Sequence, residues 1–228
     1  MEIKILASGS SGNAYIIGDG KTTLLLDAGI SFKEIQKGCG FQTSSISGCL
    51  VTHRHGDHAK AIPKLLQRGI KVYGNADVAE IHKGVRVLDP LQEHTIGTFR
   101  ILPFEAEHDV PCYGYQVTSE ETGEKLAYIT DSAYIKYTFT GLTHLMVEAN
   151  YAQEILLDNA KSERVPLFLA ERVIQTHMSI ETLLELLRAN DMSKVRQIYL
   201  LHLSDGNSDA EDFRRQVQQE TGAEVYIA

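Results

Sequence analysis

The stretch LVTHRHGDHAKAI, residues 50–62, places several metal-binding side chain types close together. The six residues 53–58 contain three of the nine histidines of the chain and one aspartate: His53, His55, Asp57 and His58. In an extended segment, residues two apart point to the same side, so His53 and His55 can converge on one ion. Gly56 permits a sharp turn, after which the next two side chains can face a neighbouring point. Imidazole and carboxylate suit borderline divalent ions such as Zn²⁺ and Mn²⁺, so the pattern predicts a metal site without thiolate ligands.

The composition is typical of one compact globular domain, which we predict to span residues 1–228. The chain is 43% hydrophobic and 23% charged, and it is long enough for a substantial core. Its net charge of −8 argues against a broad cationic face for nucleic acid. Bound divalent ions would add local positive charge that this count omits, so the composition leaves the substrate open.

The sequence also indicates a cytoplasmic protein without membrane contact. The first ten residues, MEIKILASGS, lack the apolar segment of a secretory signal. No run approaches the roughly 18 apolar residues that cross a bilayer. The three cysteines are odd in number and lack CxxC spacing, which is typical of reduced thiols rather than disulfides or a zinc ribbon.

Short strands alternate with helices along the whole chain. Strands are predicted at 2–7, 13–18, 22–29, 47–53, 98–108, 112–120, 125–131, 143–150, 195–204 and 223–228. Helices are predicted at 31–38, 59–69, 152–165, 179–190 and 208–222. Two helices are expected to begin with capping boxes, Ser31 with Glu34 and Ser208 with Glu211. This order fits sheets that are covered on the outside by helices.

The segment THRHGDH, residues 52–58, resembles the H-x-H-x-D-H signature of the metallo-β-lactamase superfamily. Matching residues follow in the family's order, each at the end of a predicted strand: His108 in EAEHD, Asp131 in YITDS and His202 in LLHLS. Asp27 in LLLDAG resembles the acid that supports the metal site without binding the metal. The resemblance covers essentially the whole chain and implies an α/β protein with a four-layer αββα sandwich.

The resemblance also implies a ligand set for two divalent ions, with zinc or manganese expected. It assigns His53, His55 and His108 to one ion, Asp57, His58 and His202 to the other, and Asp131 to both. Two such ions can deliver a hydroxide to phosphorus and neutralise the developing charge. Asp57 and Asp131 are therefore candidate catalytic residues, and Asp131 can orient the attacking water.

Three further segments resemble the small YycJ/WalJ-like branch of the superfamily: LASGSSGNAYII at 6–17, VEANY at 147–151 and THMS at 176–179. That branch is regarded as phosphodiesterases, including DNA exonucleases. The chain lacks the large inserted domain and the long flexible arm of RNA-processing members. The resemblance therefore favours a phosphodiester substrate, with DNA among the candidates.

Four residues outside the ligand set are candidates for substrate contact or for support of the metal site. His177 precedes a helix whose expected N-cap is Ser179, where backbone N–H groups attract phosphate. We expect His177 to contact the scissile phosphate or protonate the leaving oxygen, although it could instead bond a nearby carbonyl at the start of the helix. Glu148 and Asn150 end a strand, where they either support the site or bond within a loop.

The glycine-rich segment SGSSGN, residues 8–13, allows two interpretations. Its glycines would let backbone N–H groups converge on a phosphate. It lacks the lysine of a P-loop and no helix follows it, so a tight turn between strands is favoured. Ser11 or Asn13 could still face the site.

Two other classes of function remain open. A small-molecule hydrolase acting on a cyclic or metabolite phosphodiester, or on a thioester, would use the same ligands and differ in cleft shape and flanking charge. A non-catalytic metal-binding module would be indicated by a missing ligand, and none is missing. The sequence does not determine the oligomeric state.

Overall fold

A computed structural model describes all 228 residues of the chain. The chain divides into two compact units, Met1–Glu105 with Val110–Glu124, and Ala106–Asp109 with Lys125–Ala228. Its strands form one sheet of six and one of seven strands, accompanied by helices. The α/β class predicted from the sequence is therefore confirmed. That residues 1–228 form a single domain stays a prediction.

The first unit contains the six-stranded sheet, in the order β1-β2-β3-β4-β5-β6. Its strands are β1 (Glu2–Ala7), β2 (Ala14–Gly18), β3 (Thr23–Leu26), β4 (Ile46–Leu50), β5 (Val72–Gly74) and β6 (Arg86–Val87). The first three pair antiparallel, and β3 to β6 pair in parallel. Parallel neighbours need a crossover connection, which here contains α1 (Phe32–Gly38), α2 (Gly56–Ala59), α3 (Ile62–Gln67) and α4 (Ala76–Ile81). The unit also holds β7 (His94–Ile96), β8 (Phe99–Ala106) and β9 (Cys112–Ser119).

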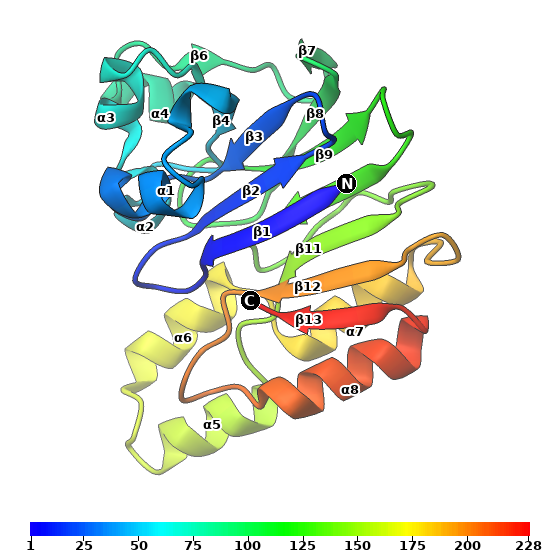
Figure 1. Cartoon of the computed structure of the whole chain (residues 1–228). Helices are drawn as coiled ribbons and strands as arrows, with labels where there is room; N and C mark the ends of the chain where they lie inside the picture. Colours follow the sequence, from blue (N-terminus) through cyan, green and yellow to red (C-terminus); the bar gives the residue numbers. More distant parts are fainter. The chain divides into compact units, whose positions relative to one another are not determined.

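Helices cover one face of the six-stranded sheet. Leu25, Cys49 and Val72 from the strands form one buried cluster with Ile35 of α1 and Leu65 of α3. Figure 1 shows these helices, in blue to cyan, beside β3 and β4. Their packing holds the loop after β4, which carries the histidine cluster, against a rigid support.

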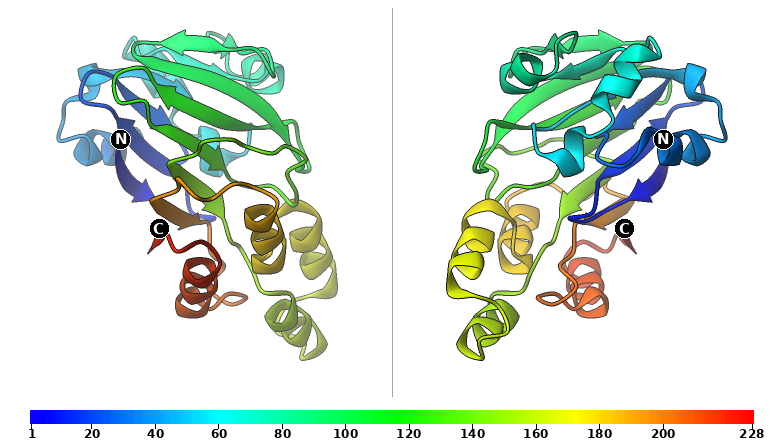
Figure 2. Two further views of the ribbon diagram at one scale, coloured as in Figure 1. Left: turned by 90° about the vertical axis from the view of Figure 1, so that its right-hand side faces the viewer. Right: turned by 90° about the vertical axis from the view of Figure 1, so that its left-hand side faces the viewer.

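The second unit is built on four parallel strands in the order β13-β12-β11-β10. They are β10 (Lys125–Ile129), β11 (His144–Glu148), β12 (Gln197–Leu201) and β13 (Glu224–Ile227). The helices are α5 (Gln153–Lys161), α6 (Leu167–Thr176), α7 (Ile180–Arg188) and α8 (Ala210–Thr221). Helix α8 packs on β13 and on α7, and α5 packs on α6 (Figures 1 and 2).

Parallel pairing aligns the carboxyl ends of three strands in the second unit. Ile129 of β10 pairs with Val147 of β11, and Glu148 pairs with Leu201 of β12. Polar residues occupy or directly follow these aligned ends, so the sheet brings together side chains that are far apart in the sequence.

The two predicted capping boxes have different outcomes. Ser31 accepts a hydrogen bond from the Glu34 N–H and donates its own N–H to the Glu34 carboxylate, as predicted. The predicted capping box at Ser208 is wrong. Helix α8 is capped one residue later by Asp209, which accepts a hydrogen bond from the Asp212 N–H. The Ser208 hydroxyl instead donates to a loop carbonyl, and the Asp209 carboxylate has a charge that complements the helix dipole.

The patterns in the sequence do not predict α4, α6 or the strands β5, β6 and β7. Helix α4 and the three strands are two to six residues long, which is too short to display a helical or strand period. Helix α6 has ten residues, and the helical spacing of Ala170, Val173 and Ile174 was overlooked. None of the helices combines the length and the apolar character required to cross a bilayer.

A glycine in the first unit allows the closest backbone approach near the histidine cluster. A Cβ atom on Gly29 would lie 1.5 Å from the Asp57 carbonyl oxygen and 2.7 Å from the Asn13 nitrogen. The Asn13 N–H donates to that Asp57 carbonyl at 2.7 Å, and the Gly29 N–H donates to the Asn13 carbonyl at 2.8 Å. Three backbone segments therefore meet where only a hydrogen atom fits.

We predict that Gly29→Ala destabilises the protein by roughly 1–3 kcal/mol or more, because the added methyl must displace backbone atoms. Thermal unfolding followed by circular dichroism measures this effect. Gly206→Ala is the matched control, because nothing lies within 4 Å of its Cβ position. A melting temperature equal to that of the wild type would show that the segment carrying Asp57 moves aside without cost.

Candidate metal centre

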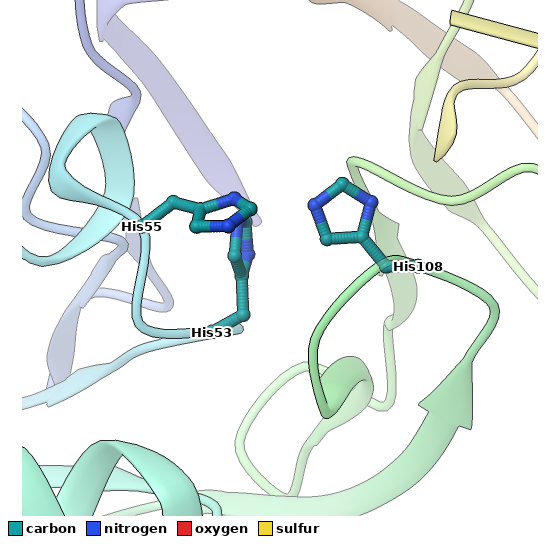
Figure 3. Close-up of side chains that lie close together, drawn as sticks. All are labelled: His53, His55 and His108. Carbon is teal, nitrogen blue, oxygen red and sulfur yellow. The ribbon is translucent and has the colours of Figure 1, made fainter. Parts of the chain in front are cut away.

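The histidine cluster of the first unit lies in the loop after β4, with His53 and His55, and in helix α2, with His58. The ring of His53 is 4.7 Å from that of His55 and 4.3 Å from that of His58, measured between centroids. Figure 3 shows the rings of His53 and His55 next to each other. The expectation that alternate residues of this loop converge is therefore met within this unit.

The change of direction at Gly56 differs from the expected sharp turn. Gly56 is the first residue of α2 and is not among the glycines with positive φ. His55 is extended, with φ −60° and ψ 148°, and the chain enters the helix directly after it. The helical turn places the Asp57 carboxylate 3.7 Å from Nε2 of His58.

Asp27 orients side chains of the histidine cluster through hydrogen bonds. It is fully buried, and its carboxylate accepts hydrogen bonds from the Thr52 N–H at 2.8 Å and from Nδ1 of His58 at 2.8 Å. The Thr52 hydroxyl lies 3.0 Å from Nδ1 of His53. Contacts at Nδ1 fix the orientation of an imidazole and leave Nε2 as its metal-binding atom. The expected supporting role of Asp27 agrees with these contacts.

Asn13 belongs to this cluster as well. Its side chain is buried, and its amide nitrogen lies 3.0 Å from Nε2 of His58. Its Oδ1 accepts hydrogen bonds from the Gly9 N–H and the Tyr15 hydroxyl. A turn between strands was expected here. The segment does turn, and it also brings the Asn13 side chain to the histidines, whereas Ser11 is exposed. Asparagine directly before a buried strand was the available signal.

In the second unit, four side chains gather at the carboxyl ends of the parallel strands. Asp131 follows β10, Glu148 ends β11, His202 follows β12 and His177 ends α6. One possible ligand atom of each lies within 4.8 Å of those of the others. Asp131 and His202 belong to the predicted ligand set, whereas Glu148 and His177 were placed outside it.

Glu148 is the centre of this group. Its Oε1 accepts a hydrogen bond from Nδ1 of His177 at 2.6 Å and lies 3.3 Å from Nδ1 of His202. Its Oε2 accepts from the N–H groups of Ser132 at 3.0 Å and Met178 at 3.1 Å. Burial alone would raise the pKa of this carboxyl, but the charge and hydrogen bond of His177, with that of His202, hold the pKa below its usual value. Glu148 is therefore an ionised group that orients two imidazoles.

His202 is held from two sides. Asn150 donates its side-chain N–H to the His202 carbonyl at 2.8 Å, and its amide nitrogen also lies 3.0 Å from Nδ1 of His202. Burial lowers the pKa of His202, but the negative charges of Asp131 and Glu148 outweigh it, so the pKa is raised. Asn150 thus supports a predicted ligand, which was one of its two expected roles.

His108 lies in the segment Ala106–Asp109 and is labelled in Figure 3. Its Nδ1 donates to the Thr176 carbonyl at 2.9 Å, and its Nε2 lies 3.1 Å from Oδ1 of Asp109. Burial lowers the pKa of His108 below its usual value despite the nearby Asp131 carboxylate. The last residue of α6 therefore orients His108, and the residue after it is His177.

Ser179 caps α7 as predicted. Its side chain accepts a hydrogen bond from the Thr182 N–H at 3.2 Å, and the residue is fully buried. His177 lies at the end of α6 and contacts a carboxylate, rather than the nearby carbonyl that was the alternative. Its side chain is 18% exposed, so solvent reaches part of the ring.

Backbone strain coincides with the candidate site. Six residues other than glycine have positive φ, and three of them are Asp27 (55°), Asp131 (48°) and His202 (54°). A left-handed conformation costs such residues about 1–3 kcal/mol and is found preferentially at functional sites. In each case the strained residue follows the end of a strand, so the turn redirects the side chain.

The donor set fits divalent metal ions. It consists of imidazoles and carboxylates without thiolates, and borderline divalent ions accept these ligands. In four histidines Nδ1 lies close to an oxygen of the protein, which orients Nε2 toward the site: His53, His58, His108 and His202. Nε2 of His58 also lies 3.0 Å from the Asn13 amide nitrogen, and Nε2 of His108 lies 3.1 Å from Oδ1 of Asp109.

Comparison with known proteins shows the family. A family model described as a beta-lactamase superfamily domain matches residues 22–203, and the chain belongs to this superfamily. The chain is 29% identical over 226 residues to exodeoxyribonuclease WalJ of Streptococcus pneumoniae, covering 90% of this chain and 82% of the relative. It is 28% identical over 240 residues to exodeoxyribonuclease YycJ of Bacillus anthracis, covering 96% and 88%.

A solved structure shows the same fold. The metallo-beta-lactamase fold protein YhfI of Bacillus subtilis superposes with a TM-score of 0.75 at 20% identity, covering 99% of this chain and 95% of that one. The metallo-β-lactamase fold predicted from the sequence is therefore confirmed. The family and the histidine and aspartate clusters together indicate divalent metal binding.

We predict that Asp27→Asn lowers metal affinity by roughly 10–100-fold, the usual effect of losing a group that orients a ligand. If the amide oxygen accepts from Thr52, the amide N–H₂ must face Nδ1–H of His58, and the two donors repel. Competition with a chromogenic chelator measures the affinity. Asp89→Asn removes an equal charge from an exposed residue and serves as the control. Equal affinities for the two variants would contradict an orienting role.

Proposed function

We propose that the protein is a metal-dependent phosphodiesterase that acts on nucleic acid, with DNA as the preferred substrate. The observation that carries this proposal is the donor set, in which imidazoles oriented through Nδ1 accompany carboxylates at strand ends. Two relatives named as exodeoxyribonucleases, each aligned over 90% or more of this chain, support DNA as the substrate. The odd number of cysteines supports a cytoplasmic location.

We propose that the ligands are distributed as the family pattern implies, over two zinc or manganese ions. One ion would be held by His53, His55 and His108, the other by Asp57, His58 and His202, with Asp131 shared. When bound, such ions supply a nucleophile at neutral pH and stabilise negative charge on the phosphoryl group. Asp27, Glu148 and Asn150 would keep the imidazoles in the binding orientation.

His177 and Glu148 would form the proton-donating pair. The 2.6 Å contact between Nδ1 of His177 and the ionised Glu148 stabilises a protonated imidazole. Such an imidazole can release the proton at Nε2 to the leaving oxygen and be reprotonated by solvent, which reaches the ring. This arrangement favours the catalytic role of His177 over a purely structural one.

We expect metal-reconstituted protein to hydrolyse bis-p-nitrophenyl phosphate and DNA, with activity abolished by a chelator and restored by Zn²⁺ or Mn²⁺. Single-stranded DNA, double-stranded DNA, RNA and a β-lactam are tested in parallel with the same preparation. His53→Ala provides the background rate, because it removes a ligand. Hydrolysis of the β-lactam without hydrolysis of any phosphodiester would overturn the proposal.

We expect His177→Ala to lower kcat by roughly 10²–10⁴ on DNA, the usual span for a general acid, while the metal content is unchanged. The loss should be smaller for bis-p-nitrophenyl phosphate, because p-nitrophenolate leaves without protonation. His94→Ala is the control, because its ring lies 3.3 Å from the Asp89 carbonyl in an exposed contact.

Two other outcomes would assign His177 a different role. Similar losses of kcat for substrates with good and poor leaving groups would indicate that His177 binds the phosphate. Unchanged turnover of DNA with a lower melting temperature would indicate that it only holds the end of α6. Metal content, melting temperature and the two rates on one variant distinguish these roles.

A further inference from the structure

A pocket in the second unit lies between the segment 134–138 and helix α7. Its volume is about 180 Å³, and the residues that determine its chemistry are Tyr134, Lys136, Tyr137, Met178, Thr182 and Glu185. None of these residues belongs to the proposed ligand set or to the proton-donating pair. We refer to this cavity as the α7 pocket.

Both walls of the α7 pocket are anchored on the carboxylate that orients His177. Oε2 of Glu148 accepts the N–H of Ser132, two residues before the segment, and the N–H of Met178, which lines the pocket. Oε1 of the same carboxylate accepts from His177. The pocket is therefore held in a defined position relative to the proposed proton donor.

The far end of the segment is fixed as well. The Phe139 N–H donates to Oδ1 of Asn190 at 2.6 Å, and the Asn190 amide donates to the Leu186 carbonyl at 2.7 Å. The segment is thus tied to Glu148 of β11 at one end and to Asn190, just after α7, at the other. A cavity bounded by such a segment is formed before a ligand arrives, which is typical of binding sites.

The lining suits a planar aromatic ring near a phosphate. Tyr134 is 56% exposed, and the Lys136 ammonium lies 5.5 Å from the centroid of the Tyr137 ring. Aromatic faces stack on bases, and a neighbouring cation attracts the phosphate backbone. Thr182 and Glu185, one turn apart on α7, offer a hydroxyl and a carboxylate to the edge of a ring.

The size and charge of the pocket select among ligands. About 180 Å³ is well below the roughly 300–1,000 Å³ of pockets for drug-sized molecules, so one ring system fits and a longer segment does not. The Glu185 carboxylate repels a phosphate in the pocket but accepts N–H groups of a base. These features favour a base over its phosphate as the occupant.

We propose that the α7 pocket binds the base of a nucleotide adjacent to the phosphodiester bond on which His177 acts. This inference rests on the proposed function, because it assigns a subsite for the nucleic acid substrate. The pocket would position the scissile bond by stacking of the base on an aromatic ring.

The first test combines a protein variant with a substrate that lacks one base. Single-stranded oligodeoxynucleotides carry one abasic residue at successive positions near the cleaved bond. We expect one position at which loss of the base lowers kcat/KM of the wild type by roughly 5–150-fold, the range for one stacked base. Tyr134→Ala should lower kcat/KM by a similar factor on the intact strand and by little on that abasic strand. Phe168→Ala removes another exposed aromatic side chain, 73% exposed on α6, and should leave both rates unchanged.

Two results would overturn the inference. In the first, the fold losses of kcat/KM caused by Tyr134→Ala and by the abasic residue multiply at every position, which would mean that the Tyr134 ring does not contact the missing base. Alternatively, Tyr134→Ala could behave like Phe168→Ala on every strand, which would mean that Tyr134 does not contact the substrate.

The second test does not depend on catalysis. Deoxynucleosides without phosphate are titrated into ¹⁵N-labelled protein prepared without metal, up to their solubility limits. We expect amide shifts confined to residues 134–138 and 182–189, which disappear in Tyr134→Ala. No shifts, or shifts elsewhere, would contradict the pocket even if DNA is hydrolysed. Shifts at the pocket in a protein that hydrolyses no phosphodiester would contradict the proposed function alone.

Discussion

The buried carboxylate of Glu148 is the interaction on which the candidate site of the second unit depends. An ionised carboxylate without solvent exposure is costly unless charged or polar donors surround it. Here it accepts from His177 and from two backbone N–H groups, those of Ser132 and Met178. These donors belong to different segments of the unit. The charge of Glu148 therefore helps to position His177, the loop after β10 that holds Ser132, and Met178 before α7.

Asp27 has the equivalent role in the first unit. It is also fully buried, and it contacts Nδ1 of His58 while it accepts the Thr52 N–H. In both units an acid outside the proposed ligand set holds the nitrogen that does not bind metal. Such acids fix the tautomer of the imidazole and raise its basicity, so they act on metal affinity without touching the metal.

The strained backbone at strand ends shows how the fold aims these side chains. Asp131 and His202 adopt left-handed conformations directly beyond parallel strands, and each conformation costs about 1–3 kcal/mol. Hydrogen bonds offset part of this cost, as when Asn150 donates to the His202 carbonyl. A regular continuation of the strand would alternate side chains across the sheet, and the left-handed residue redirects them at the strand end.

Local patterns in the sequence determined the longer strands and helices other than α6, the cap at Ser31 and the histidine loop, because strand period, capping chemistry and ligand spacing involve neighbouring residues. The resemblance to the superfamily extended this to the fold. The same reasoning chose Ser208 as a cap, because adjacent acceptors compete and only the path of the chain decides between them. Tertiary structure alone decided that Asn13 meets His58, 45 residues away, and that Glu148 orients His177, 29 residues away. Contacts between such distant residues depend on how strands align and helices pack, and no spacing along the chain encodes that geometry.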